Sequence, residues 1–162
     1  MALTLLVTGG TRSGKSNFAE ERVRDFGQNL GKRLVYIATA EAFDEEMTAR
    51  IARHQRRRGP EWHTVHAPLD LVRAVTQTDG KGPCVIDCLT LWLSNLMLAG
   101  QDTEVAADAL VASLASRADP VILVTNEVGS GIVPENALAR RFRDEAGRLN
   151  QIVAQAVDEV YV

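Results

Sequence analysis

Eight consecutive residues near the N-terminus have the pattern of a phosphate-binding loop, G-x-x-x-x-G-K-[ST]. They are Gly9, Gly10, Thr11, Arg12, Ser13, Gly14, Lys15 and Ser16. In such a loop backbone N–H groups surround the phosphates, the lysine neutralises the β and γ oxygens, and the serine hydroxyl ligates Mg²⁺. A plain glycine turn that caps a helix is the alternative, but this loop lies between an apolar run and a helical pattern, as a phosphate site requires. We therefore expect a nucleoside triphosphate site, with Lys15 and Ser16 at its phosphates.

The metal of such a site needs a carboxylate at the end of a neighbouring strand. Asp87 ends the apolar run 84–87, and Glu127 follows the apolar run 121–125. An apolar strand that ends in Asp is the usual source of this carboxylate in P-loop enzymes. We therefore predict Ser16 and Asp87 as ligands of Mg²⁺, whereas a helix cap or loop anchor explains Glu127 equally well.

A basic segment between residues 45 and 58 carries a single histidine, His54. Its five arginines are Arg50, Arg53, Arg56, Arg57 and Arg58. At helical spacing Arg50, His54 and Arg58 share one face, where the guanidinium charges disfavour an imidazolium and attract a triphosphate. A neutral histidine there is a reasonable covalent nucleophile towards phosphorus. From these residues alone, a solvated basic face with an incidental histidine is the commoner explanation.

Strand-like and helix-like segments alternate along the whole chain. The expected strands are 3–8, 34–38, 62–66, 84–87, 121–125 and 159–162. The expected helices are one that follows Lys15, one over 44–57, a short one over 69–75, one that begins near Thr90, and two more over 105–114 and 137–157. Short apolar strands that alternate with helices imply a mainly parallel sheet covered on both faces. We therefore predict an α/β fold, a single P-loop NTPase domain over 1–162, with a glycine-bearing functional loop over 126–134.

Composition excludes several other classes of protein. The 162 residues carry 18 Lys and Arg against 21 Asp and Glu, a formal charge of -3, so no global charge favours nucleic acid. No apolar run approaches the length of a membrane span and the first residues lack the pattern of a signal peptide, so we expect a cytoplasmic protein. Cys84 and Cys88 have no partners at metal-ligand spacing, and we expect buried, reduced thiols.

Four separated stretches form a combination that is more specific than the loop alone. They are V-T-G-G-T-R-S-G-K-S at 7–16, Y-I-A-T-A at 36–40, M-T-A-R-I-A-R-H at 47–54 and V-T-N-E-V-G-S-G-I-V-P-E-N at 124–136. With R-F-R-D at 141–144 and G-R-L-N-Q at 147–151, they resemble the bifunctional adenosylcobinamide kinase/adenosylcobinamide-phosphate guanylyltransferase family of cobalamin biosynthesis. The resemblance spans essentially the whole chain.

The resemblance implies two reactions and a RecA-like sheet. The first phosphorylates a hydroxyl on the aminopropanol arm of adenosylcobinamide with ATP or GTP. The second transfers GMP from GTP to the product through a guanylylated histidine, which corresponds to His54. The resemblance also implies a homotrimer, and nucleotide-binding residues beyond the phosphate loop. These are Ala38, Thr39, Ala40, Gln55, Arg56, Arg57, Arg58, His66 and Asp87.

One position departs from the family pattern, which usually reads W-x-T-x-E. Here the segment 62–66 reads W-H-T-V-H, so His66 replaces a Glu that would contact the nucleotide, and the change bears on guanine selectivity. Two alternatives to the bifunctional enzyme are a GTP-binding regulatory switch and a monofunctional P-loop kinase for another small alcohol. A switch predicts slow hydrolysis and a protein partner, whereas the bifunctional enzyme predicts covalent GMP on His54 without any partner.

Overall fold

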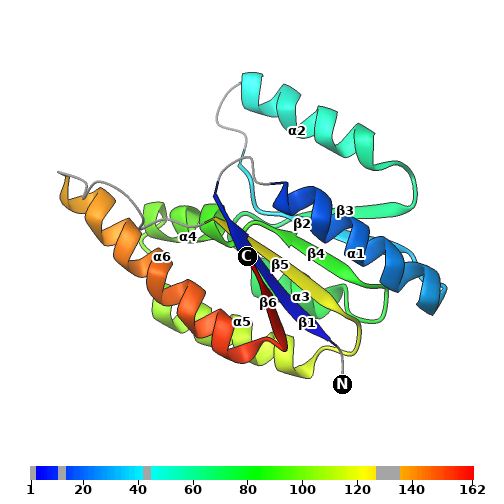
Figure 1. Cartoon of the computed structure of the whole chain (residues 1–162). Coiled ribbons are helices and arrows are strands. Elements are labelled where there is room, and N and C mark those ends of the chain that lie inside the picture. The colour runs from blue at the N-terminus through cyan, green and yellow to red at the C-terminus, as the bar shows by residue number, and fades with distance from the viewer. Residues whose placement is uncertain (1–2, 11–13, 42–44, 127–135) are drawn as a thin grey trace.

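A computed structural model of the chain describes residues 3–10, 14–41, 45–126 and 136–162. The strands in these residues are β1 (Thr4–Gly9), β2 (Leu34–Ala38), β3 (Trp62–His66), β4 (Cys84–Asp87), β5 (Val121–Asn126) and β6 (Glu159–Tyr161). The helices are α1 (Lys15–Leu30), α2 (Glu45–Arg58), α3 (Leu71–Gln77), α4 (Leu89–Leu98), α5 (Thr103–Ser116) and α6 (Ala137–Ala156). The strands form one sheet of order β3-β2-β4-β5-β1-β6, and every neighbouring pair is parallel (Figure 1).

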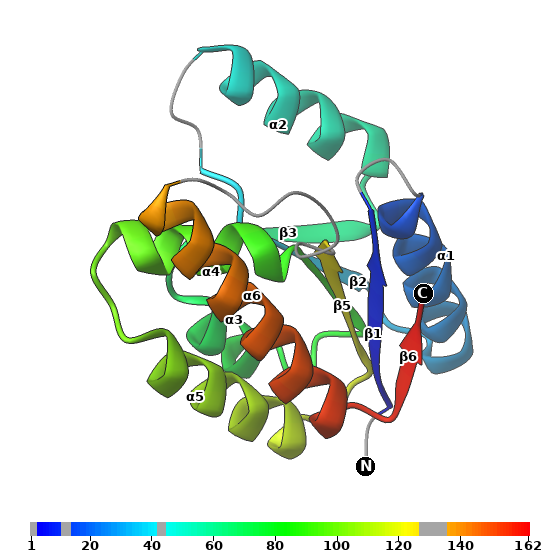
Figure 2. The same ribbon diagram turned by 60° about the vertical axis from the view of Figure 1, so that its left-hand side comes forward.

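Each face of the sheet is covered by its own helices. Along β1, Leu5 and Val7 belong to one buried cluster and Leu6 to the other, as the alternation of a strand requires. The first cluster packs against Ala19 and Val23 of α1, whereas α3, α4, α5 and α6 cover the opposite face (Figures 1 and 2). The prediction of an α/β fold with helices on both faces is confirmed.

The parallel arrangement brings the C-terminal ends of the strands to one edge of the sheet. In the register, Gly9 of β1 pairs with Asn126 of β5, and Ala38 of β2 pairs with Asp87 of β4. Figure 2 shows α2 beyond this edge, apart from the helices that cover the sheet. Ligands of open α/β sheets bind outside this edge, so the fold gathers the residues predicted from the sequence where a ligand is expected.

The phosphate loop leads into α1 through a left-handed residue. Gly14 has φ 79° and ψ 12°, and its carbonyl accepts the N–H of Phe18 at 3.0 Å. Glycine adopts this conformation without the steric cost that a side chain adds. The turn starts the helix at Lys15, and the first N–H groups of a helix have no intrahelical partner, which makes them available to an anion.

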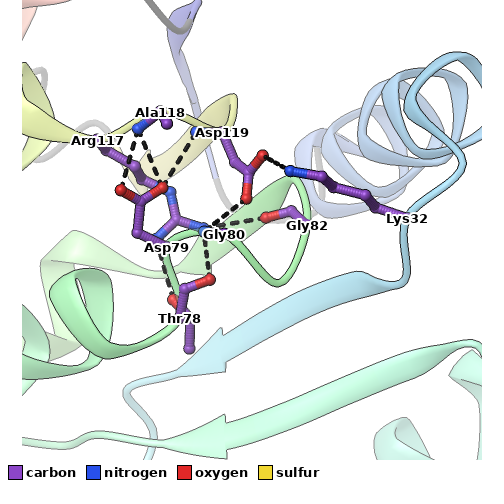
Figure 3. A network of polar contacts seen from close by, with 8 residues as sticks. All are labelled: Lys32, Thr78, Asp79, Gly80, Gly82, Arg117, Ala118 and Asp119. Carbon is purple, nitrogen blue, oxygen red and sulfur yellow. Dashed lines mark hydrogen bonds and ion pairs between the residues drawn. The ribbon is translucent and has the colours of Figure 1, made fainter.

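A buried polar network holds the opposite, N-terminal edge of the sheet (Figure 3). Arg117 is 4% exposed, and its guanidinium donates to the Thr78 hydroxyl and to the Gly82 carbonyl, both at 3.0 Å. Asp119, 3% exposed, accepts from Lys32 Nζ at 2.7 Å and from the Gly80 N–H at 2.8 Å. The network joins the turns before β4 and β5, far along the sheet from the phosphate loop, so its role is structural.

Candidate functional site

Ser16 and Asp87, the two residues predicted to hold a metal, lie together. The Ser16 hydroxyl donates to Asp87 Oδ2 at 3.2 Å. Ser16 belongs to the first turn of α1, and Asp87 is the last residue of β4, which is separated from β1 by β5 in the sheet. The pair therefore forms because α1 leans across β5 towards β4. A hydroxyl and a carboxylate are the kind of oxygen ligands that Mg²⁺ takes alongside waters and substrate phosphates.

A larger set of metal ligands is not needed for this ion. Within the described residues, no group of three or more His, Cys, Asp or Glu side chains is arranged to hold a metal. Mg²⁺ in nucleotide enzymes is usually held by one or two protein groups and completed by phosphates and water. The donor set at Ser16 and Asp87 fits that ion better than it fits a zinc centre.

The lysine of the phosphate loop lies back across the loop. Lys15 Nζ donates to the Gly10 carbonyl at 2.9 Å, and the lysine side chain is half-buried. This bond holds the ammonium group close to Gly10, a residue of the phosphate-binding motif. Gly9 ends β1 and Gly14 starts α1, as the motif predicts. The predictions for Thr11, Arg12 and Ser13 fall outside the described residues.

A pocket of about 450 Å³ opens beside the Ser16–Asp87 pair. Its lining residues are Ser16, Asn17, Glu20, Glu21, Arg24, Tyr36, Arg57, Arg58 and Asp87. They come from α1, β2, β4 and the C-terminal end of α2, and they carry both carboxylates and guanidinium groups. Among the described residues predicted from the sequence, the lining includes Arg57 and Arg58 but not Gln55, Arg56 or His66.

Arg58 is the buried cation of this pocket. The residue is 7% exposed, and its Cζ lies 3.5 Å from the centroid of the Tyr36 ring, so the guanidinium stacks on the aromatic face. Within the described residues, its buried Nε has no hydrogen-bond partner. A buried donor without a partner costs free energy, and a phosphate oxygen is an acceptor that a guanidinium binds well.

Tyr36 and Glu20 complete the electrostatics around Asp87. The Tyr36 hydroxyl donates to Asp87 Oδ2, the oxygen that also accepts from Ser16. Burial, the Asp87 charge and this hydrogen bond raise the pKa of Tyr36 well above its ordinary value, so the phenol stays protonated. Burial also raises the pKa of Glu20, and the positive charges of Arg58 and Arg24 partly offset that rise. The negative charge of Asp87 also raises the pKa of Glu20, so the two carboxyl groups lie near enough to interact.

Thr39 lies just beyond β2. It contacts the backbone of Cys88, the residue after Asp87, and it does not line the pocket. Its side chain is fully buried; the hydroxyl donates to the Cys88 carbonyl at 2.7 Å and accepts the Cys88 N–H at 2.9 Å. The Asn95 side chain donates to the Thr39 carbonyl at 2.8 Å. Thr39 thus ties the end of β2 to the end of β4, and the one proton of its hydroxyl is donated to the backbone of Cys88.

The remaining predicted residues lie around the rim of this edge. Ala38 is buried at the end of β2 and Ala40 is half-buried. Gln55 and Arg56 are exposed on α2, and His66 is exposed at the end of β3. His54 belongs to α2, but its side chain lies outside the described part of the chain. The loop expected from Asn126 is described only at Asn126 itself, so Glu127 also falls outside.

The sequence reasoning missed five residues of the pocket lining, which are Asn17, Glu20, Glu21, Arg24 and Tyr36. Tyr36 was noted only as part of a family stretch, and Glu20 not at all. Glu20 follows Ser16 by four positions, one helical turn, so the helical period alone puts it on the same side of α1. Nothing comparable marks Tyr36, because its partners Asp87 and Arg58 are distant in the sequence.

Comparison with known proteins finds relatives over nearly the whole chain. The model of the family described as cobinamide kinase / cobinamide phosphate guanyltransferase matches residues 5–162. The bifunctional adenosylcobalamin biosynthesis protein CobP of Pseudomonas aeruginosa is 42% identical, over 96% of this chain and 89% of that protein. Its counterpart CobU of Salmonella typhimurium is 40% identical, over 99% of this chain and 94% of that protein.

A solved structure shares the fold at low sequence identity. The KaiC-like protein of Pyrococcus horikoshii superposes with a TM-score of 0.51 at 17% identity, and the match covers 89% of this chain and 67% of that one. Within the described residues, no helix of this chain is long and apolar enough to cross a membrane. The nearly full-length match to the family model and the identity to its bifunctional relatives show that the chain belongs to the cobinamide kinase/cobinamide phosphate guanylyltransferase family.

Proposed function

We propose that the chain performs both reactions of its family at one nucleotide site. It phosphorylates adenosylcobinamide with ATP or GTP, and it then transfers GMP from GTP to adenosylcobinamide phosphate, giving adenosylcobinamide-GDP. The observation that carries the proposal is the pocket in which Ser16 and Asp87 meet Arg57 and Arg58 of the histidine helix. Membership of a family of enzymes also decides against the regulatory switch, and its two activities decide against a single-activity kinase.

The phosphates and Mg²⁺ are assigned to the phosphate loop and its neighbours. Residues 9–16 surround the phosphates, Lys15 neutralises them, and Ser16 and Asp87 hold Mg²⁺. When bound, the ion neutralises charge that develops on the polyphosphate during transfer. The 3.2 Å bond between Ser16 and Asp87 supports this assignment, because it brings a hydroxyl and a carboxylate to the place where a metal beside the loop would lie.

The remaining nucleotide contacts come from the ends of β2, α2 and β3. The proposed residues are Ala38, Thr39, Ala40, Gln55, Arg56, Arg57, Arg58 and His66. Arg58 has the strongest support, because its buried Nε lacks a partner that a phosphate oxygen would supply. Thr39 differs from the others, because its hydroxyl proton is donated to the Cys88 carbonyl, and for this side chain we propose an indirect contribution through Cys88.

His54 is the proposed nucleophile of guanylyl transfer. A neutral imidazole nitrogen attacks the α-phosphorus of GTP; a P–N bond forms, the bond to the bridging oxygen breaks, and pyrophosphate leaves. An oxygen of the substrate phosphate then attacks the same phosphorus, the P–N bond breaks, and the imidazole is regenerated. The arginines at the end of α2 would stabilise negative charge on the transferring group. The kinase step needs no covalent intermediate, because the substrate hydroxyl attacks the γ-phosphorus in line.

The deciding experiment separates the two activities at one residue. Protein incubated with GTP labelled on the α-phosphorus should acquire acid-labile, base-stable label, and His54→Ala should abolish that label and guanylyl transfer. Phosphorylation of adenosylcobinamide by the same variant should largely persist. His63→Ala is the matched control, because His63 lies in β3 and outside the pocket lining, and it should label normally. Uptake of label by folded His54→Ala protein would move the nucleophile elsewhere, and His66 would be replaced next.

We also propose a cytoplasmic homotrimer in which α2 reaches the nucleotide site of the assembly. Figure 2 shows α2 apart from the helices that cover the sheet, and of its residues with described burial only Arg58 is buried. A largely exposed helix is a reasonable surface for a neighbouring chain. Light scattering of the active protein at micromolar concentration should give the mass of three chains, and a monomeric mass would refute the assembly.

A further inference from the structure

The helix that carries the proposed nucleophile has one buried residue among those whose burial is described, and it lies at the C-terminal end. Within α2, Arg58 is the buried residue, and the other residues whose burial is described are exposed or half-buried. Figures 1 and 2 show the helix beyond the edge of the sheet, with its C-terminal end closest to β3. The contacts of Arg58 therefore bear directly on the position of the C-terminal end of α2.

Arg58 rests on Tyr36, and Tyr36 is bonded to Asp87. The Arg58 Cζ lies 3.5 Å from the Tyr36 ring centroid, while the Tyr36 hydroxyl donates to Asp87 Oδ2. The ring is itself fixed from the side, because Trp62 packs against it edge-on, with centroids 6.0 Å apart at 82°. One buried side chain thus touches the metal-side carboxylate through its hydroxyl and the histidine helix through its face.

Both contacts lie in the interior of the chain. Tyr36 is 8% exposed and Arg58 is 7% exposed, so water has little access to the hydrogen bond or to the stack. The attraction of a cation to an aromatic face is stronger where it is desolvated.

We propose that Tyr36 is a positioning residue for both transfers, which orients Asp87 with its hydroxyl and seats the histidine helix with its ring. This role rests on the proposed function of Asp87 and His54. Tyr36 touches neither a phosphate nor the acceptor in this role, and it acts only through Asp87 and Arg58. The hydroxyl orients the metal ligand Asp87 in both reactions. The ring positions α2, which carries the proposed nucleophile of guanylyl transfer.

The hydroxyl is tested by Tyr36→Phe, which keeps the ring. The readout is the affinity for a fluorescent GTP analogue, measured with Mg²⁺ and again with EDTA. Loss of a group that orients a metal ligand typically weakens metal binding about 10-fold or more. The gain in affinity that Mg²⁺ produces, which is the affinity with Mg²⁺ divided by the affinity with EDTA, should therefore fall about 10-fold. Tyr161→Phe is the matched control, since it removes a phenol from the edge strand β6, and it should leave the ratio unchanged.

The ring is tested by hydrogen exchange of residues 45–58 in the protein without nucleotide. Tyr36→Phe should exchange like the wild type, because the aromatic face remains. Tyr36→Leu and Arg58→Met should exchange roughly 10-fold faster, as expected when a desolvated cation–π contact is lost. Arg53→Met, at an exposed position of the same helix, is the control and should exchange like the wild type.

Two results would overturn the role of Tyr36. The first is a Tyr36→Phe variant whose affinity for the GTP analogue gains as much from Mg²⁺ as that of the wild type. The second is unchanged hydrogen exchange of α2 in Arg58→Met, a variant that keeps the tyrosine and its bond to Asp87. Failure of the proposed function would look different. A wild type whose GTP affinity does not respond to Mg²⁺ would remove the metal site, and GMP labelling of His54→Ala would remove the nucleophile, while the exchange experiment would still report on the ring.

Discussion

Replacing Thr39 by valine isolates the contribution of one buried hydroxyl beside the site. Valine keeps the shape of the side chain, but the Cys88 N–H loses its partner at 2.9 Å and the Cys88 carbonyl loses a donor at 2.7 Å. That carbonyl keeps a bond from the Trp92 N–H at 3.3 Å, so only the N–H is left unsatisfied. An orphaned buried N–H costs about 1–3 kcal/mol and a lost hydrogen bond about 0.5–1.5 kcal/mol, so Thr39→Val should lower the free energy of unfolding by about 2–4 kcal/mol.

The assay is unfolding in urea at matched protein concentration, because association of chains adds to apparent stability. Thr39→Ser keeps the hydroxyl and should lose only about 1 kcal/mol, the value of a buried methyl group. Cys88 follows Asp87, so Thr39→Val should also reduce the gain in GTP affinity that Mg²⁺ produces, and serine should restore it. A valine variant as stable as the serine variant would refute the reasoning. A loss of GTP affinity in EDTA, rescued by serine, would instead indicate that Thr39 contacts the nucleotide directly.

Three further predictions concern the phosphates, the buried network and the thiols. Lys15→Ala should remove kinase and guanylyltransferase turnover together, because both reactions use the same polyphosphate, and near-normal rates in either assay of folded protein would contradict the shared site. Arg117→Met should lower the free energy of unfolding by about 3 kcal/mol in urea, because several buried acceptors lose a charged donor, whereas Arg73→Met on the exposed side of α3 should change it by less than about 0.5 kcal/mol. Burial raises the pKa of Cys84 to about 12 and that of Cys88 to about 11, so iodoacetamide at pH 8 should label neither thiol in the folded protein and both after unfolding, and rapid labelling of the native protein would show that a thiol is accessible.

The strands of this chain could be predicted closely, because most are short apolar runs and 62–66 alternates in polarity. The runs 34–38, 62–66 and 84–87 coincide with β2, β3 and β4. The face of a helix was harder to predict. Phe18 shares the apolar row of α1 with Ala19 and Val23, yet it is 36% exposed, and its ring packs 5.3 Å from that of Tyr161. Periodicity identifies an apolar side of a helix, but it does not say how far the sheet beneath it extends.

Some contacts of the candidate site could be predicted from sequence motifs, and others could not. Ser16 and Asp87 were predicted to act together because a loop motif and a strand that ends in Asp each have a known place in a parallel sheet. Their contact depends only on the strand order and on α1. The stack of Arg58 on Tyr36 depends instead on how a helix beyond the sheet returns into β3, and no pattern in either segment specifies that distance.

The arrangement suggests how one phosphate site serves two chemistries. The metal and the β and γ phosphates are assigned chiefly to the loop, α1 and the end of β4, and the arginines at the C-terminal end of α2 add further phosphate contacts. Covalent guanylyl transfer requires in addition a nucleophile at the α-phosphorus, and in this chain that nucleophile is assigned to a helix outside the sheet. Of the α2 side chains whose burial is described, only that of Arg58 is buried, so the helix can shift relative to the phosphates with little loss of buried contact. The kinase step should therefore tolerate replacement of His54, which abolishes guanylyl transfer, and Tyr36 contacts residues that serve each requirement.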